Sequence, residues 1–164
     1  MTTRKKNNLE TKTLKIVFMG TSFFAKEILE NLTRKAEIAL VVTQPDKPAG
    51  RKKTNLKETG LTIIKMDAGV DSGDIIFQKE LAINKKDTYP ILEEKLLKLT
   101  NDNLINTLQK YSNKKIQPKP QNHQKASFTK IIKKQDGLIN WNLKAKDIYN
   151  KFRAYYLWPQ IYTF

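Results

Sequence analysis

Hydrophobic and polar positions predict that strands and helices alternate in the first part of the chain. Residues 14–19 (LKIVFM) form a short apolar run rich in β-favouring residues, which predicts a buried strand. The next segment places Phe24, Ile28 and Leu32 on one face of a helix, because they recur at intervals of four residues. Residues 38–43 (IALVVT) predict a second strand. Strand, helix and strand in this order predict a βαβ unit with a parallel strand pair.

The middle of the chain predicts a second pair of strands around an acidic segment. Residues 61–66 (LTIIKM) and 75–83 (IIFQKELAI) are both rich in β-branched or aromatic residues. The segment between them, residues 67–74 (DAGVDSGD), contains three aspartates and two glycines. Its composition predicts a loop, since glycine and aspartate are depleted in strands and common in turns.

Helical patterns dominate the second half. Asp87 or Thr88 is the predicted cap of a long helix that carries an apolar stripe as far as Tyr111. Residues 112–125 are polar and contain two prolines, so they predict an extended linker. A last helix is predicted over residues 143–156, before a Trp-Pro pair that ends it.

The composition places the chain among globular proteins with an excess of positive charge. Its 164 residues suit one domain or a piece of a larger protein, and 39% of them are hydrophobic. Lys and Arg number 31 against 16 Asp and Glu, which gives a net charge of +15. This excess indicates polyanionic partners, with nucleic acid ahead of acidic membrane surfaces. An AT-rich codon bias, which raises Lys, Asn and Ile together, is the alternative explanation.

The positive charge is concentrated in two segments. Residues 47–57 hold five basic residues and residues 110–134 hold eight lysines, and neither segment contains an acid. The stretch between them, residues 58–102, has nine acids and six lysines and is net negative. The first basic segment follows a predicted parallel strand, where open α/β sheets place their ligands.

Several functional classes are excluded by residues that the sequence lacks. With no Cys and a single His, the chain has no disulfide, no thiol nucleophile, no zinc ribbon and no multi-histidine metal site. No apolar run approaches the ~20 residues that a membrane span needs. The N-terminus has basic residues but no apolar core of a secretory signal. We therefore expect a cytoplasmic protein, with an organellar transit peptide as the weaker alternative.

The acidic segment 67–74 is the strongest candidate for chemistry, and three interpretations are open. It is a calcium loop, a glycine-shaped turn with solvated carboxylates, or an active-site loop. Calcium is disfavoured, because Gly69 stands where an EF-hand ligand belongs and no Glu closes the loop. A strand-borne loop positions a carboxylate well, and a neighbouring Asp can raise the carboxyl pKa toward that of a general base.

Three other features are weaker candidates. Gly20 and Thr21 could offer backbone N–H groups to an anion, but one glycine is no dinucleotide fingerprint, so a plain strand-to-helix turn is favoured. His123 lies in the lysine-rich linker and is interpreted as an exposed loop residue. An aromatic group near the last helix could stack bases, although core packing is favoured. The members of this group are Phe152, Tyr155, Tyr156 and Trp158.

Several short motifs occur in an order found in a known family. They are residues 15–25 (KIVFMGTSFFA), 41–51 (VVTQPDKPAGR), 58–74 (ETGLTIIKMDAGVDSGD), 136–141 (DGLINW) and the Trp158-Pro159 pair. Together they resemble the methionyl-tRNA formyltransferases, a branch of the folate-dependent formyltransferase family. The basic loop and the Trp-Pro tail are more typical of this branch than of its relatives in purine synthesis.

The resemblance implies transfer of a formyl group from 10-formyltetrahydrofolate to the amino group of methionine on initiator tRNA. Asp71 matches the family's catalytic aspartate, which helps to deprotonate the attacking amine. Its neighbours in the active-site loop are Gly69, Gly73 and Asp74. The basic loop matches the family's contact with the tRNA acceptor end and contains Lys47, Arg51, Lys52 and Lys53. We expect a monomer that uses no metal and binds neither DNA nor membranes.

The chain also departs from the family pattern. The family carries an Asn-x-His motif and a following Ser-Leu-Leu-Pro after the basic loop, but here Lys57 runs directly into Glu58. Asn106 and His123 come after Asp71 and do not replace that motif. The expected oxyanion partners and most of the folate pocket are lost with it, so we expect that this chain alone does not transfer formyl.

The expected fold is α/β. It is an incomplete Rossmann-like formyltransferase domain with a mainly parallel sheet, missing the central strands and the family's C-terminal barrel-like domain. We assign residues 1–13 to a basic extension, 14–111 to the formyltransferase domain with its deletion near residues 57 and 58, and 112–164 to a linker and the start of the C-terminal region. Strands without their neighbours leave edges unpaired, so we expect a poorly closed core or rearranged pairing.

Two alternatives to this enzyme remain open. One is a non-catalytic, basic tRNA- or RNA-binding remnant, which the net charge of +15 favours. The other is a different folate-dependent formyltransferase that acts on a small amine.

Overall fold

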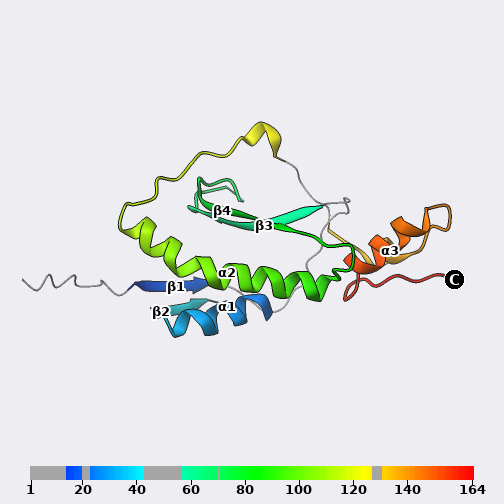
Figure 1. Cartoon of the computed structure of the whole chain (residues 1–164), viewed down its shortest axis with the longest axis horizontal. Coiled ribbons are helices and arrows are strands. Elements are labelled where there is room, and N and C mark those ends of the chain that lie inside the picture. Colours follow the sequence, from blue (N-terminus) through cyan, green and yellow to red (C-terminus); the bar gives the residue numbers. More distant parts are fainter. Residues whose placement is uncertain (1–13, 20–22, 43–56, 70, 127–130) are drawn as a thin grey trace, which may run out of the picture. The chain divides into compact units, whose positions relative to one another are not determined.

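In the described part of the chain, a strand, a helix and three further strands are followed by helices, and the first three elements alternate as the sequence predicts (Figure 1). The computed structural model describes residues 14–19, 23–42, 57–69, 71–126 and 131–164. The described elements are β1 (Lys15–Met19), α1 (Phe23–Thr33), β2 (Glu37–Val42), β3 (Glu58–Ile64), β4 (Ile75–Ala82), α2 (Tyr89–Ser112), the short 3-10 helices η1 (His123–Lys125) and η2 (Lys134–Gly137), and α3 (Ala145–Ala154). The α/β class is confirmed. The chain divides into two compact units, residues 1–44 and 45–164.

The first unit is the predicted βαβ unit. β1 and β2 pair in parallel, beginning with Lys15 opposite Glu37. The side chains of these two residues also form an ion pair of 3.4 Å across the strands. The connection runs through α1, which contacts β2 and buries Leu32. A parallel pair requires such a crossover, because its strands cannot be joined by a tight turn.

The second unit is built on an antiparallel hairpin. β3 and β4 pair from Glu58 opposite Ala82 to Ile64 opposite Ile75. The long helix α2 contacts both strands. Thr88, one of the two predicted caps, is the N-cap residue of α2. After α2 the chain returns to the hairpin, where residue 119 forms an isolated bridge with the start of β4.

Among the described residues, the two strand pairs belong to separate sheets. A sheet generally needs three or more strands, or a packed helix, to be independently stable. The separation agrees with the expected loss of central strands. Among the described residues the buried apolar side chains are correspondingly few: Leu32, Ile76, Tyr155 and the fully buried Pro159.

The aromatic residues near α3 show the effect of this small core. Core packing is confirmed for Tyr155, which is buried, but it is wrong for Phe152, Tyr156 and Trp158, which stay exposed. Phe152 instead packs edge-on against Tyr156, with ring centroids 5.7 Å apart. The helical spacing thus correctly indicates an apolar face, but in the described part of the chain most of this face stays exposed.

Candidate functional site

The loop between β3 and β4 carries the acidic segment singled out in the sequence. A hydrogen bond from the Lys65 N–H to the Asp74 carbonyl oxygen (2.8 Å) closes its base. Gly73 is buried and lies so close to the Lys65 carbonyl that a Cβ atom would collide with it. Glycine is needed here for this close approach and not for a left-handed turn, since no described glycine has a positive φ.

Asp67 organises one side of the loop. Its Oδ1 accepts hydrogen bonds from the Ser72 hydroxyl (2.7 Å) and the Gly69 N–H (3.0 Å). These bonds lower the pKa of the Asp67 carboxyl, Ser72 most and Gly69 next, while desolvation opposes them. The charge of His123 lowers this pKa further by a smaller amount. Asp67 therefore serves the loop as an ionised acceptor.

Asp71 occupies a different environment on the same loop. Its backbone is left-handed, with φ 54°, a conformation that Asp tolerates better than most residues with a Cβ atom. The residue is exposed, and its carboxylate makes no hydrogen bond or ion pair with another described residue. Asp71 is held instead through its backbone, because the Gln121 Nε2 donates a hydrogen bond to the Asp71 carbonyl oxygen at 2.9 Å.

Asp67 and Asp71 line a common pocket of about 240 Å³. The other lining residues are Ile64, Met66, Gly69 and Ser72. The lining thus combines two apolar residues, Ile64 and Met66, with two aspartates. A carboxylate without hydrogen bonds at such a pocket can accept a proton from a bound amine or from a water molecule.

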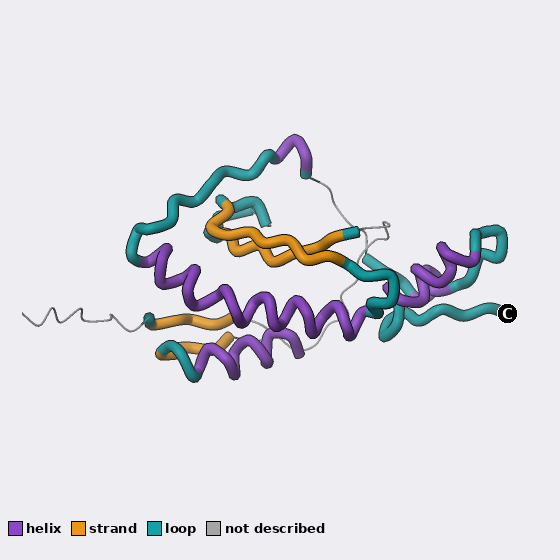
Figure 2. The backbone as a smooth tube through the Cα atoms, viewed as in Figure 1, coloured by secondary structure: helices purple, strands orange, loops and turns teal. Residues whose placement is uncertain are grey.

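Gln121, which the sequence did not single out, binds the loop from the linker after α2. Gln121 Nε2 also donates to the Gly73 carbonyl oxygen at 2.6 Å. Figure 2 shows the linker that carries Gln121 running back from the end of α2 toward the hairpin. Two prolines of this linker predict an extended segment, but no pattern in the sequence indicates which part of the chain it binds.

The remaining predicted site residues have the following positions. Gly69 lines the pocket, Asp74 closes the base of the loop, and His123 opens η1 as an exposed residue, as predicted. Gly20 and Thr21, and the four basic residues Lys47, Arg51, Lys52 and Lys53, lie outside the described residues.

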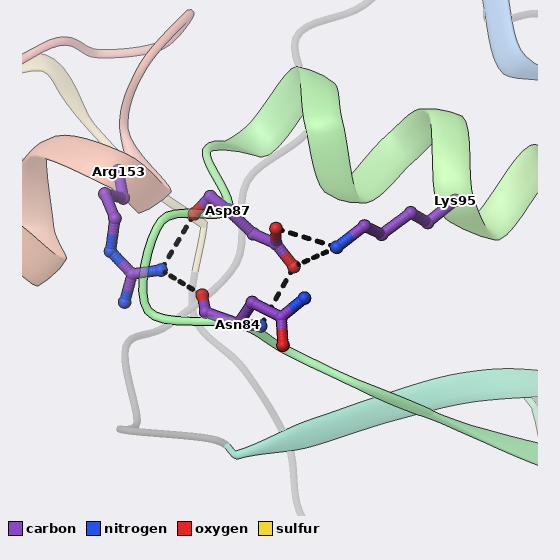
Figure 3. A network of polar contacts seen from close by, with 4 residues as sticks. All are labelled: Asn84, Asp87, Lys95 and Arg153. Carbon is purple, nitrogen blue, oxygen red and sulfur yellow. Dashed lines mark hydrogen bonds and ion pairs between the residues drawn. The ribbon is translucent and has the colours of Figure 1, made fainter.

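A second polar cluster lies at the turn between β4 and α2 (Figure 3). Each carboxylate oxygen of the buried Asp87 accepts a bond of 2.7 Å from the Lys95 ammonium, and Oδ2 also accepts from the Asn84 N–H at 2.9 Å. The Lys95 bond is the main cause of a lowered Asp87 pKa, which desolvation opposes. Arg153 of α3 donates to the Asn84 and Asp87 carbonyl oxygens at 3.0 and 2.8 Å. This cluster ties α3 to the turn.

Two classes of site are not found in the described part of the chain. No group of three or more His, Asp or Glu side chains that could hold a metal ion occurs there. None of the described helices combines the length and the apolar character that crossing a bilayer requires.

Two family models match the chain. The model described as "Formyl transferase" matches residues 54–108, a range that includes the whole acidic loop. The model described as "Formyl transferase, C-terminal domain" matches residues 131–164.

Curated relatives are named methionyl-tRNA formyltransferase. The protein of Caldicellulosiruptor saccharolyticus is 32% identical over 235 residues, which cover 90% of this chain and 75% of that protein. The protein of Thermodesulfovibrio yellowstonii is 41% identical over 108 residues, which cover 66% of this chain and 35% of the relative. The first alignment is longer than the 164 residues of this chain, so part of that relative has no counterpart here.

Solved structures share the fold at low sequence identity. Methionyl-tRNA formyltransferase from Clostridium thermocellum has a TM-score of 0.61 at 15% identity, with 87% of this chain and 82% of that chain covered. A HypX variant from Aquifex aeolicus has a TM-score of 0.71 at 12% identity, with 93% and 37% covered. WlaRD, a sugar 3N-formyl transferase solved in the presence of dTDP and 5-N-formyl-THF, has a TM-score of 0.54 at 22% identity, with 84% and 42% covered.

Proposed function

The chain belongs to the formyl transferase family, and on that premise we propose that it carries the proton-accepting loop of a methionyl-tRNA formyltransferase. The reaction moves a formyl group from 10-formyltetrahydrofolate to the methionine amino group of initiator tRNA. One observation carries the proposal. Asp71 lines the pocket, its main chain is held by Gln121, and its carboxylate bonds to no other described residue.

The proposed reaction needs a base that removes a proton from the methionine ammonium group. An amine attacks a formyl carbon only in its neutral form, so the ammonium group of methionine must lose a proton before or during the attack. The Asp71 carboxylate takes that proton, directly or through a water molecule. The amine nitrogen bonds to the formyl carbon and gives up a second proton, the bond from that carbon to the donor nitrogen breaks, and the donor nitrogen leaves with that second proton.

The described residues supply an acceptor for this proton, but they supply neither the space nor the oxyanion donors expected of a binding site for the formyl donor. The pocket of about 240 Å³ is below the roughly 300–1,000 Å³ of typical ligand sites. Its described lining contains Asp and Ser but neither Asn nor His. Missing oxyanion donors cost on the order of 100- to 1,000-fold each in rate. We therefore propose that this chain alone does not complete the transfer.

The test compares this chain with a variant that restores the missing stretch. In the variant, the stretch of the Caldicellulosiruptor relative that has no counterpart in this chain is inserted between Lys57 and Glu58, where the resemblance implies the family's Asn-x-His motif. Each protein is incubated with 10-formyltetrahydrofolate and methionyl-tRNA, and formyl-methionyl-tRNA is measured. We expect product from the restored chain and none from the original chain.

Asp71→Ala tests the role of the loop within the restored chain. It is expected to lower kcat by about 10²- to 10⁴-fold, the usual contribution of a general base. Asp102→Ala, at an exposed position of α2, is the matched control and should leave kcat unchanged. A restored chain that is equally active without the Asp71 carboxyl would refute the proposed role. Asp71-dependent transfer by the original chain would refute the claim that it is incompetent.

The excess of positive charge favours a second candidate function, RNA binding without catalysis. The chain carries a net charge of +15. Its described C-terminal segment exposes Trp141 and Trp158, and the Lys134 ammonium lies 5.8 Å from the centroid of the Trp158 ring. Exposed rings and cations suit single-stranded nucleic acid, which binds by stacking and by phosphate contacts.

Salt dependence of tRNA binding tests this second function. Changing Arg51, Lys52 and Lys53 to Ala should weaken binding and reduce the slope of log K against log salt by about 0.9 for each phosphate that the variant no longer neutralises. Changing the exposed Lys79, Lys85 and Lys86 to Ala is the control with the same loss of charge. Equal effects of the two triple changes, or binding that ignores salt, would contradict RNA recognition by the basic loop.

A further inference from the structure

The linker after α2 binds the Asp71 loop at two adjacent points. Lys119 exchanges backbone hydrogen bonds with Ile75, the first residue of β4, at 2.7 and 2.9 Å. Two residues later, the Gln121 side chain reaches into the loop itself. Gln121 is partly buried, whereas residues 122–126 after it are exposed. The linker is therefore docked on the loop through residue 121, and the residues that follow it are exposed.

Gln121 uses its whole donor capacity on the loop. Its Nε2 donates to the carbonyl oxygens of Asp71 at 2.9 Å and Gly73 at 2.6 Å. A primary amide nitrogen carries two protons, so these two acceptors satisfy it completely. The pair of bonds spans Ser72 and fixes the two carbonyl groups relative to one another.

We call the two hydrogen bonds from Gln121 the clamp. One of them binds the described residue of the loop that has a positive φ. Asp71 has φ 54°, a conformation that Asp tolerates better than most residues with a Cβ atom but that is still less favourable than the ordinary backbone regions, so contacts with its surroundings help to keep it. Asp67 ties Gly69 and Ser72, so it constrains the chain on either side of Asp71. Among the described residues, Gln121 supplies the side-chain bond to the Asp71 main chain.

We propose that Gln121 is a positioning residue, whose amide holds Asp71 in its left-handed conformation and thereby orients the Asp71 carboxylate for proton transfer. The importance of that orientation rests on the proposed function, whereas the clamp is a property of this chain alone. Gln121 lies outside both family-model matches, which cover residues 54–108 and 131–164. On this proposal, the segment between them is part of the active-site loop's support.

Amide hydrogen exchange of the full chain, followed by NMR, tests the clamp directly. The probes are the Lys65 and Gly69 N–H groups, whose acceptors both belong to the loop. Gln121→Ala should accelerate their exchange on the order of tenfold for each hydrogen bond removed. Gln124→Ala, at an exposed position of η1, is the matched control and should change neither rate. Unchanged protection in Gln121→Ala would overturn the proposal.

An acid-dependent variant separates the clamp from a general loss of folding. Gln121→Glu keeps the shape of the side chain, but the ionised carboxylate has no proton to donate to the two carbonyl groups. Loop protection should be lost at neutral pH and partly regained near the ordinary Glu pKa of about 4.3, where the carboxyl gains one O–H donor. Protection is corrected for the intrinsic pH dependence of exchange. A Glu variant that stays unprotected throughout, or behaves like the original chain throughout, would overturn the proposal even if the Ala variant fails to fold.

Activity of the restored chain distinguishes failure of this inference from failure of the proposed function. Gln121→Ala should lower kcat on the order of tenfold with little change in KM, because a misoriented base slows the chemical step without loosening substrate. If Asp71→Ala retains activity, the proposed function fails and the exchange data still decide the clamp. If Asp71→Ala is inactive but Gln121→Ala is fully active, the positioning role fails.

Discussion

Asp71 and Asp87 lie before and after β4, and the chain holds them in opposite ways. Asp87 is 7% exposed, and its carboxylate accepts three hydrogen bonds from Lys95 and the Asn84 N–H (Figure 3). Asp71 is exposed and is held through its main chain by Gln121. Its carboxylate bonds to no other described residue.

The difference separates a carboxylate that stabilises the fold from one that is available for chemistry. Hydrogen bonds that saturate an ionised carboxyl lower its pKa and make it a poor proton acceptor near neutral pH. A carboxylate that stands on a fixed backbone and bonds to no other group is available to a substrate. Loss of the Asp87 carboxyl should therefore appear in stability, and loss of the Asp71 carboxyl should appear in transfer by the restored chain.

Removal of the Asp87 carboxyl is expected to change the free energy of unfolding more than any other substitution considered for this comparison. Asp87→Ala leaves the Lys95 ammonium and the Asn84 N–H without their acceptor. We expect the free energy of unfolding to fall by about 2–4 kcal/mol, measured by urea denaturation. Asp71→Asn, which removes the carboxylate but keeps a residue that tolerates the left-handed backbone, should change it by no more than about 0.5 kcal/mol, as for other exposed positions. Equal losses in the two variants would contradict the distinction between them.

The same carboxylate should make stability depend on pH in acid. The Asp87 pKa in the folded chain is lowered from its ordinary value of 3.8, so its contribution is complete above that value and disappears as pH falls through the folded pKa. Between about pH 5 and pH 2 the original chain should lose stability more steeply than Asp87→Asn. Asp67 adds a slope of the same sign to both proteins, because its pKa is also lowered. Parallel curves would show that Asp87 is not responsible.

The elements around these two aspartates follow from local patterns. The run LKIVFM predicts β1 (Lys15–Met19) almost to the residue, and the cap signal at Asp87 or Thr88 predicts where α2 begins. Both signals are contained in a few neighbouring residues, so a single sequence is enough to detect them. The acidic loop is also predictable, because its glycines and aspartates are poor strand formers.

The contacts that distinguish the two carboxyl groups are not predictable in this way. Gln121 binds Asp71 across 50 positions of sequence, and Arg153 binds the Asp87 carbonyl across 66. Such pairs leave no periodic signal, because they arise from where the linker and α3 return to the hairpin. Local patterns describe Asp87 as a helix cap and Gln121 as part of a plain linker, and neither description contains its partner.

Gly73→Ala sharpens the comparison by disturbing the backbone that holds Asp71 while leaving every carboxyl group in place. A Cβ atom at this position would collide with the Lys65 carbonyl oxygen, so the base of the loop must shift. We expect a loss of about 1–3 kcal/mol in unfolding free energy, the usual effect of forcing extra volume into a packed site. Gly69→Ala is the control, because its Cβ would meet the Ser72 side chain, which can rotate. A larger loss in Gly69→Ala would contradict the close approach at Gly73.

Ser72→Ala is expected to have the smallest effect, and it acts on the titration of one exposed carboxyl. The Ser72 hydroxyl is the largest cause of the lowered Asp67 pKa, so its removal should raise that pKa toward 3.8 while the Gly69 N–H keeps part of the lowering. Carboxyl ¹³C NMR titration of Asp67 measures the change, and the Asp87 resonance serves as the internal control. His123→Ala should raise the Asp67 pKa by less, since it removes a charge and not a hydrogen bond. The opposite ranking would mean that the charge of His123 lowers the Asp67 pKa more than the Ser72 hydrogen bond does. In that case both Asp67 and the Asp71 backbone would depend mainly on the linker that carries Gln121 and His123.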